Sequence, residues 1–275
     1  MGAAEDRWAE QLAGWAIPPE ILAQASADPW KLTPNLFPAA DPADEPPDNP
    51  SFRAAREALG DGGTLLDVGV GGGAASLPLA PPATQVTGVD VSEEMLKAFT
   101  AAARERGVKS RYYAGRWPDN ARAVPAADVV ICHHAFYNVP DLADFAVALT
   151  NHARRRVVVE LTGKHPVSLT NPLWKHFWDL DRPDGPTADD AVAVLQEAGI
   201  DELDVQREER VRRRRVEHAD RVAFTTRRLC LTFDRQAEVE EAMAKYPEPD
   251  AWEVVTLSWP GGVPDPTPDD EDEQG

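Results

Sequence analysis

An acid and three alternating glycines stand at the end of an apolar stretch, in the run from Asp67 to Gly73 (DVGVGGG). Glycine lets the backbone turn sharply and lets a ligand approach without a Cβ in the way. In an open parallel sheet, ligands bind outside the carboxyl ends of the strands. The run therefore predicts a strand, a ligand-binding turn and the start of a helix.

Two classes of cofactor fit this turn. Gly69, Gly71 and Ala74 match a dinucleotide-binding fingerprint, and the same glycines suit S-adenosylmethionine. Asp67 favours S-adenosylmethionine, because a carboxylate ahead of the turn suits a cationic, amine-bearing ligand and would repel a pyrophosphate. The next apolar stretch ends at Asp90, which can accept hydrogen bonds from both ribose hydroxyls of either cofactor. A nucleotide-dependent oxidoreductase is disfavoured, because no tyrosine is followed four residues later by a lysine.

A second group of reactive side chains follows the apolar stretch 128–132 and contains His133, His134 and Tyr137. A histidine at a strand end can take a proton from a hydroxyl or ammonium nucleophile near neutral pH. Alternatively, His133 binds the cofactor backbone and His134 caps the next helix. These three residues are the candidate catalytic groups. No metal is expected, since the remaining histidines and the cysteines lack ligand spacing.

Strand and helix patterns alternate from residue 64 onward, as in a parallel sheet with helices on both faces. The predicted strands are 64–68, 85–89, 111–114, 128–132, 155–161, 203–211 and 252–259. The predicted helices are 52–59 with Ser51 as N-cap, 74–79, 92–106, 142–150, 187–198, 218–230 and 236–245.

The two ends of the chain differ from this middle part. Residues 5–25 have helical spacing that Pro18 and Pro19 interrupt, which predicts two short helices acting as a cap. Residues 34–50 are rich in proline and predict an extended connection. Residues 263–275 predict a disordered acidic tail. The chain is thus divided into a cap and connection (1–50), a main domain (51–261) and a tail (262–275).

The net charge of −19 over 275 residues is concentrated at the ends, because residues 1–50 hold nine acids against two bases and residues 262–275 hold six acids. No nucleic-acid partner is expected, and the arginines at 207–215 are interpreted as a charged strand-and-turn surface. No apolar run reaches the length of a membrane span. The acidic first twenty residues lack a signal peptide, which predicts a cytoplasmic protein. Cys132 and Cys230 are expected to be core thiols.

Three segments, at 65–80, 86–99 and 128–145, resemble the class I S-adenosylmethionine-dependent methyltransferases, in an uncharacterised bacterial branch. The resemblance implies an α/β, Rossmann-like fold with a mostly parallel seven-stranded sheet, an antiparallel last strand at 252–259, and helices on both faces. It implies S-adenosyl-L-methionine as cofactor. Its residue assignments are Asp67, Gly69, Gly71 and Gly73 around the methionine and ribose, Asp90 at the ribose hydroxyls, and Val91 against adenine.

The chain departs from this family after the third strand. The family commonly has an acid beside adenine there, whereas this chain has Gly115, Arg116, Trp117 and Pro118. Arg116 and Trp117 are assigned to the cofactor site by their position, with Trp117 stacking on adenine or on the methionine side chain. Packing of Trp117 in the core is the alternative.

The resemblance implies methyl transfer to an O or N nucleophile of a small-molecule acceptor, a reaction in which positioning matters more than acid–base groups. The fourth strand does not end in the Asn-Pro-Pro-aromatic arrangement of enzymes that methylate nucleic-acid bases. The aromatic-rich stretch 172–178 either walls the acceptor pocket or packs in the core. The alternative function is non-catalytic binding of S-adenosylmethionine or S-adenosylhomocysteine. The oligomeric state is left open.

Overall fold

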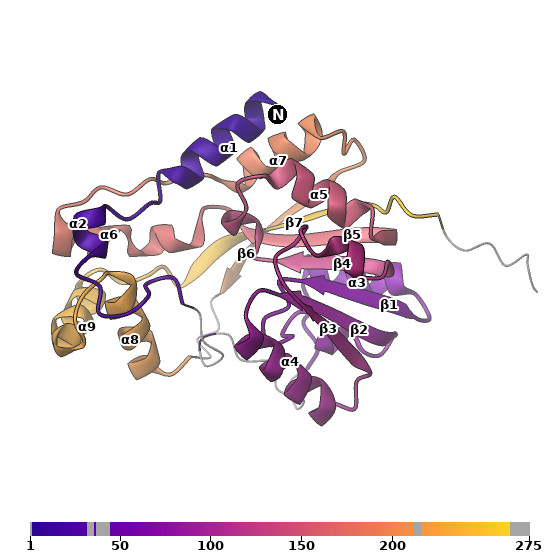
Figure 1. The fold of residues 1–275 in the computed structure, drawn as a ribbon, viewed down its shortest axis with the longest axis horizontal. Helices are drawn as coiled ribbons and strands as arrows, with labels where there is room; N and C mark the ends of the chain where they lie inside the picture. The colour runs from indigo at the N-terminus through magenta and orange to yellow at the C-terminus, as the bar shows by residue number, and fades with distance from the viewer. Residues whose placement is uncertain (1, 32–35, 37–44, 212–215, 265–275) are drawn as a thin grey trace, which may run out of the picture.

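A central sheet organises the protein, in a computed structural model that describes residues 2–31, 36, 45–211 and 216–264 (Figure 1). Its seven strands lie in the order β3-β2-β1-β4-β5-β7-β6. The strand bounds are β1 Gly63–Val68, β2 Ala83–Asp90, β3 Ser110–Ala114, β4 Ala127–His133, β5 Ala153–Thr162, β6 Asp204–Val211 and β7 Ala251–Pro260. Strands β1 to β5 pair in parallel, and β7 is antiparallel to both β5 and β6. The predicted Rossmann-like sheet with an antiparallel last strand is confirmed.

The strand order reverses at β1, which has β2 on one side and β4 on the other. Asp67 near the end of β1 is in register with Gly88 of β2 and Ile131 of β4. The carboxyl ends of the three strands therefore meet at one edge, the place where open α/β sheets bind ligands. This register brings the turn after β1 close to the histidines after β4.

Helices cover both faces of the sheet, as predicted. Helices α3 (Pro50–Leu59) and α4 (Glu93–Glu105) pack on one face, in a core cluster that includes Phe52, Phe99 and Val129. Helices α1 (Ala3–Ala13), α5 (Leu142–Thr150) and α7 (Ala188–Glu197) pack on the other. Because β1, β4 and β5 are buried on both faces, they are nearly continuous apolar runs in the sequence.

The predicted helix at 74–79 is wrong. The chain forms turns there and only one short 3₁₀ helix, η1 (Leu77–Leu79). Prolines at 78, 81 and 82 explain this, because proline has no backbone N–H to donate and its ring clashes with a preceding helical turn. The backbone that leaves the turn after β1 is therefore held by tight turns rather than by a long helix.

The predicted N-cap of α3 is also wrong. The cap is Asn49, whose Oδ1 accepts a hydrogen bond of 2.9 Å from the Phe52 backbone N–H. Pro50 occupies the first helical position, where its missing N–H costs nothing. Ser51 lies one residue further into the helix and its hydroxyl points toward β5, where it takes part in the site described below.

The remaining helices form a second cluster, called here the helical lobe. It contains α2 (Pro19–Leu22), α6 (Asn171–Trp178), α8 (His218–Arg228) and α9 (Gln236–Lys245), which bury Ile21, Trp174, Leu229 and Val239 together. The lobe lies beyond the edge of the sheet where β5 ends (Figure 1). The predicted helices at 218–230 and 236–245 are confirmed.

The two short helices predicted at the N-terminus are present, but they pack in different places. Helix α1 packs against α5 and α7 and contributes the fully buried Trp8 to their core cluster. Helix α2 belongs to the helical lobe. Most of the predicted proline-rich connection and of the acidic tail lies outside the described residues. Within the described part, Gly262 and Val263 still donate backbone hydrogen bonds to Thr150 and Ala153.

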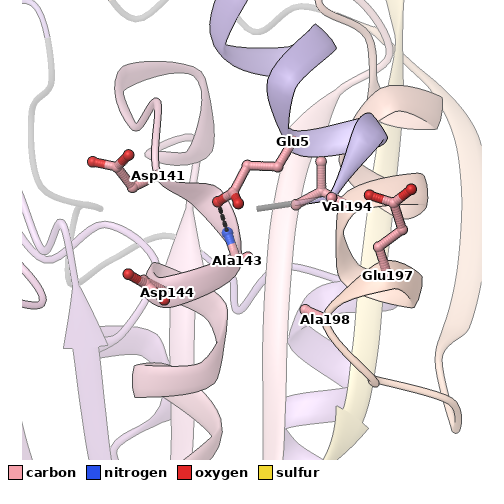
Figure 2. Close-up of a pocket in the computed structure, with 8 residues that line it drawn as sticks. Glu5, Asp141, Ala143, Asp144, Val194, Glu197 and Ala198 are labelled. Carbon is pink, nitrogen blue, oxygen red and sulfur yellow. Dashed lines mark hydrogen bonds between the residues drawn. The ribbon is translucent and has the colours of Figure 1, made fainter.

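An acidic hollow lies between α1, α5 and α7 (Figure 2). Its carboxylates hold helices in place: Glu5 Oε1 accepts from the Ala143 N–H at 3.1 Å, and Glu197 Oε2 accepts from the Ala4 N–H at 2.8 Å. Both N–H groups belong to the first turns of helices, which have no partner inside the helix. We therefore attribute this hollow to the attachment of α1.

Candidate active site

The turn after β1, residues 69–73 and called here the glycine loop, requires its glycines. Gly69, Gly71 and Gly73 have φ angles of +80°, +51° and +83°, which L side chains rarely adopt. A Cβ on Gly73 would lie 2.8 Å from a ring carbon of Phe99 and 2.9 Å from Leu77. The Gly69 N–H donates to the Val89 carbonyl at 2.8 Å, which ties the loop to β2. The loop therefore exposes backbone at the edge where β1, β2 and β4 end.

Asp90 connects this loop to the end of β2. Its Oδ2 accepts from the Gly71 N–H and its Oδ1 from the Ser92 N–H, both at 2.9 Å. Each carboxylate oxygen keeps a further lone pair for a ligand hydroxyl. The next residue, Val91, is 69% exposed and offers an apolar surface beside the carboxylate. This pair has the chemistry of a ribose and adenine site.

Asp67 lies beneath the glycine loop with an unused acceptor. Its side chain is buried and its Oδ2 has no hydrogen-bond partner among the described residues. Burial raises the pKa of Asp67 to about 7; the Asp90 charge acts in the same direction and the Ser76 hydroxyl opposes it. A buried acceptor without a donor is costly, and a cationic donor would remove that cost.

The two histidines at the end of β4 differ in their surroundings. His133 is half-buried and its Nε2 is buried without a hydrogen-bond partner. Burial lowers the pKa of His133 to about 4, so its ring is neutral near neutral pH. His134 has a φ of +58°, its backbone N–H donates to the Glu160 carbonyl at 2.7 Å, and its side chain is 44% exposed. Its Nε2 lies 3.2 Å from Glu160 Oε1.

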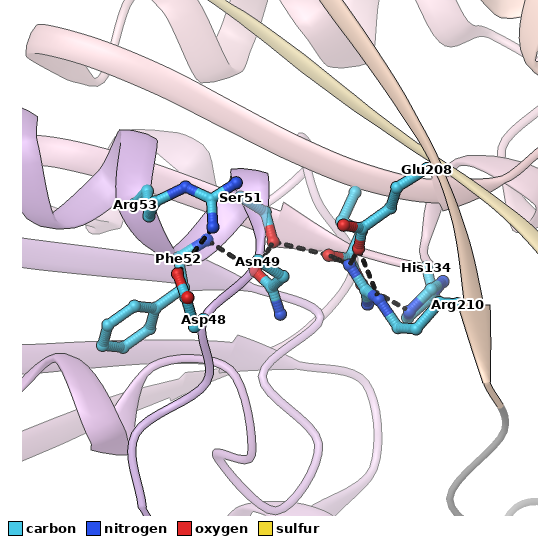
Figure 3. A network of polar contacts seen from close by, with 9 residues as sticks. Asp48, Asn49, Ser51, Phe52, Arg53, His134, Glu208 and Arg210 are labelled. Atoms are coloured by element: carbon cyan, nitrogen blue, oxygen red, sulfur yellow. Dashed lines mark hydrogen bonds and ion pairs between the residues drawn. The ribbon is translucent and has the colours of Figure 1, made fainter.

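Glu160 is buried and contacts Ser51, His134 and Arg210, which are labelled in Figure 3. Arg210 of β6 holds both of its oxygens, at 2.7 and 2.9 Å, and the Ser51 hydroxyl donates to Oε2 at 2.5 Å. Burial would raise the pKa of this carboxyl, but the hydrogen bonds and charges of His134, His133 and Arg210 outweigh it and hold the pKa well below its usual range. Glu160 is therefore an ionised acceptor fixed beside His134.

Sequence reasoning missed Glu160, Arg210 and Ser51. One signal was available, since Glu160 is a single acid inside an otherwise apolar strand (VVVEL). A buried acid within such a strand needs partners, because an unpaired buried charge is strongly unfavourable. The partners lie 50 and 109 residues away in sequence, so spacing alone gave no indication of them.

Tyr137, predicted as a catalytic group, is a structural residue. Its ring is buried and stacks on Trp8 with 5.6 Å between ring centres, and its hydroxyl donates to the Thr162 carbonyl at 2.6 Å. Burial raises the pKa of Tyr137 well above its usual range, so the hydroxyl keeps its proton. We therefore leave Tyr137 out of the catalytic groups proposed below.

Trp117 takes the packing alternative rather than the predicted stacking on a cofactor. It is 5% exposed, its Nε1–H donates to the Phe145 carbonyl at 3.4 Å, and its ring meets His152 edge-on. Arg116, beside it, is exposed. In the aromatic stretch 172–178, Trp174 is buried within the helical lobe. Both cysteines are free and buried, as expected of core thiols.

Searches for two other kinds of site gave negative results within the described ranges. There, no group of three or more His, Cys, Asp or Glu side chains is arranged to hold a metal ion. Nor is any helix of the described part long and apolar enough to cross a membrane.

Comparison with known proteins identifies the domain. Residues 66–156 match the family model of a methyltransferase domain. The chain is 33% identical over 90 residues to a ubiquinone biosynthesis O-methyltransferase of Rickettsia canadensis, covering 33% of this chain and 38% of that protein. A protein of the same name from Bordetella parapertussis is 36% identical over 110 residues, covering 39% and 46%. The chain therefore spans less than half the length of these curated relatives.

Solved structures share the fold at low identity. The YcgJ protein of Bacillus subtilis matches with a TM-score of 0.51 and 16% identity, over 78% of this chain and 98% of that one. A coclaurine N-methyltransferase bound to N-methylheliamine and S-adenosylhomocysteine matches with a TM-score of 0.51 and 13% identity, over 94% and 86%. Together with the methyltransferase-domain match over residues 66–156, this shared fold confirms the predicted resemblance to the class I S-adenosylmethionine-dependent methyltransferases.

Proposed function

We propose that this protein transfers the methyl group of S-adenosylmethionine to a hydroxyl oxygen of a small-molecule acceptor. The observation that carries the proposal is the meeting of three features at one sheet edge. These are a glycine loop over the unpartnered Asp67 Oδ2, the ribose-type acceptor Asp90, and a histidine oriented by a buried carboxylate. The names of the O-methyltransferase relatives favour oxygen over nitrogen as the acceptor atom.

The residues present fit S-adenosylmethionine better than a dinucleotide. The buried Asp67 carboxyl offers an acceptor to a cationic ligand, and the same group would repel a pyrophosphate near the glycine loop. Positive φ angles at Gly69, Gly71 and Gly73 leave the loop without side chains on its ligand side. Asp90 would bind the ribose hydroxyls, and Val91 would cover adenine.

When bound, the cofactor supplies a methyl group on a positively charged sulfur, which is already electrophilic. The protein's own part is to orient the acceptor and remove its proton. His134 is the candidate base. Because Glu160 is an ionised acceptor, the Nε2 of His134 carries the hydrogen between them, which leaves a basic lone pair on Nδ1. His133 is neutral at physiological pH, so its ring nitrogen can accept a hydrogen bond from the methyl-accepting substrate or from the cofactor.

Calorimetry with S-adenosylmethionine and NAD tests the cofactor assignment. We expect S-adenosylmethionine to bind and NAD not to bind. Asp90→Ala should weaken binding by about 1.5–3 kcal/mol, because two hydroxyls lose a charged acceptor. A folded Asp90→Ala variant with unchanged affinity, or a preference for NAD, would contradict the proposal. Acceptors are then screened by release of S-adenosylhomocysteine.

Non-catalytic binding of the same cofactor is tested by the same screen. His134→Ala should lower turnover by about 10²–10⁴-fold on a hydroxyl acceptor while cofactor affinity changes little, because the proton is removed only in the transition state. Cofactor binding without turnover on any hydroxyl or amine acceptor would favour the binding protein instead.

A further inference from the structure

Three arginines of the helical lobe, Arg182, Arg227 and Arg228, lack a carboxylate partner. Arg182 follows α6, and the other two end α8. Among the residues that the structure describes, none of the three forms an ion pair with an Asp or Glu side chain, although the chain carries a net charge of −19. The charge of Asp28 acts on Arg228 without forming an ion pair with it, and guanidinium groups removed from water without a paired carboxylate are unfavourable. Their grouping therefore suggests an anion that belongs to a ligand.

Arg228 is the most buried of the three, with 8% of its surface exposed. Its Nη1 donates to the Pro29 carbonyl at 3.2 Å, and its guanidinium lies 4.1 Å from the ring centre of Trp30. Burial, together with the charge of Arg182, lowers the pKa of Arg228 to about 10, so the group remains cationic near neutral pH. A guanidinium has five N–H donors, and the Pro29 carbonyl engages only part of this capacity.

Arg182 lies close enough to Arg228 for the two charges to repel each other. It is half-buried, donates to the Trp15 and Ala16 carbonyls, and lies 5.0 Å from the ring centre of Trp174. Its Nε is buried and has no acceptor among the described residues. The two cations are thus held by backbone carbonyls and by aromatic faces, with donor capacity left over.

A series of contacts runs from this pair toward the candidate active site. Burial, with the charges of Arg228 and Arg182, lowers the pKa of His165 to about 4, and the His165 ring lies 5.0 Å from that of Tyr137. Tyr137 follows His134 by three residues. On the other side, the segment that Arg228 holds continues to Lys31, which pairs with Glu94 in the first turn of α4 at 3.9 Å. Helix α4 begins just after Asp90.

We infer that Arg228 and Arg182 bind a carboxylate of the methyl acceptor, which lies against the aromatic rings of Trp15, Trp174 and Trp30. The inference rests on the proposed methyl transfer and names the class of acceptor: an aromatic or otherwise planar acid. A carboxylate would occupy the spare donors in the paired geometry that guanidinium favours, and would cancel the repulsion between the two cations. In an otherwise acidic protein, such a site also attracts an anionic acceptor that the remaining surface repels.

The test uses benzoate and its neutral analogue benzamide as probes, titrated by calorimetry into the full-length protein with and without S-adenosylhomocysteine. We expect benzoate to bind at least tenfold more tightly than benzamide. Arg228→Met should remove this preference, and Arg228→Lys, which keeps the charge but loses the planar donor pair, should reduce it. Arg235→Met is the matched control, because Arg235 belongs to the same lobe but pairs with Glu238 at 2.7 Å. It should leave the preference unchanged.

Each outcome bears on one proposal. Equal binding of benzoate and benzamide, or a preference that survives in folded Arg228→Met, overturns the carboxylate site. If thermal melting shows that Arg228→Met does not fold, the benzoate preference is measured in Arg182→Met and Arg228→Lys instead. Failure of S-adenosylhomocysteine to bind contradicts the proposed methyl transfer, whereas the benzoate preference is measured separately without it. If S-adenosylhomocysteine binds but benzoate is not preferred over benzamide, the carboxylate site is contradicted and the proposed function is not.

Discussion

At the scale of single residues, the two histidines after β4 receive different roles because their second partners differ. Glu160 orients His134 and is itself fixed by Arg210 and Ser51. Within the described part of the chain, no such partner contacts the Nε2 of His133, and burial keeps that ring neutral. We therefore propose that residues distant in sequence make one of these two histidines a base and the other a hydrogen-bond acceptor.

Glu160→Gln tests the orienting role. We expect turnover to fall by about tenfold or more with little change in S-adenosylmethionine affinity, because the amide no longer stabilises a protonated imidazole. Since the change removes the Glu160 charge from partly buried Arg210, which keeps only its ion pair with Glu208, a Glu160→Gln/Arg210→Met variant controls for lost stability. A normal turnover rate in a folded variant would contradict the orienting role.

Asp67→Asn separates ligand binding from stability. The raised pKa of Asp67, about 7, means that the folded protein holds a proton that the unfolded chain releases at lower pH. In the parent protein, the Asp67 carboxyl therefore lowers the stability of the fold as pH rises from about 4 toward 7. The amide avoids this cost, so the variant should melt at a higher temperature than the parent at pH 8, and the difference should shrink at pH 5. Its affinity for cationic S-adenosylmethionine should fall. If the variant and the parent had the same melting temperature at pH 8 and also at pH 5, the burial of an ionisable Asp67 would be contradicted.

How far the site could be predicted depended on how local its signals were. Asp67, Asp90 and the loop glycines lie within two strand–turn units, where an acid or glycine after an apolar run marks the ligand edge. Tyr137 looked equally suitable, but its hydroxyl is taken by a carbonyl 25 residues away and its ring by α1. Such long-range hydrogen bonding leaves no pattern in the local sequence.

At the scale of elements, the strands were predictable and one helix was not. A strand buried on both faces is mostly apolar, so the buried parts of β1, β4 and β5 stand out in the sequence. The stretch after the glycine loop resembles a helix start, yet prolines at 78, 81 and 82 prevent one. Element prediction failed where backbone hydrogen-bonding capacity, rather than hydrophobic spacing, decided the outcome.

Gly73→Ala tests how tightly the glycine loop is packed, with Gly107→Ala as the matched control. Both glycines have positive φ angles, +83° and +68°. A Cβ at position 107 meets nothing within 4 Å, whereas one at position 73 would clash with Phe99 and Leu77. We expect Gly107→Ala to cost about 1 kcal/mol of backbone strain and Gly73→Ala about 2–4 kcal/mol, with weakened cofactor binding. Equal loss of stability in urea unfolding would contradict the close packing of the loop.

At the scale of the whole molecule, the acidic N-terminus is attached to the core. Helix α1 carries Trp8 into the core, and Glu5 and Glu197 accept hydrogen bonds at helix starts. Helical spacing interrupted by Pro18 and Pro19 predicted the two short helices, and long-range contacts decide where each of them packs. The apolar spacing of its first helix was the informative signal.

The two ends can be compared directly by Trp8→Ala and by deletion of residues 265–275. Trp8 is fully buried, its Nε1–H donates to the Val139 carbonyl at 2.7 Å, and its ring supports Tyr137. Its replacement by alanine should cost about 3–5 kcal/mol, through lost burial and a cavity beneath α1.

The deleted tail contains only polar, acidic, proline and glycine residues and has no apolar side chain to bury. Its removal should leave the melting temperature and S-adenosylmethionine affinity unchanged, provided that Gly262 and Val263 are kept. Thermal melting of both variants decides the matter: a stable Trp8→Ala protein would mean that α1 is dispensable, and a destabilised deletion would mean that the tail contributes contacts to the domain.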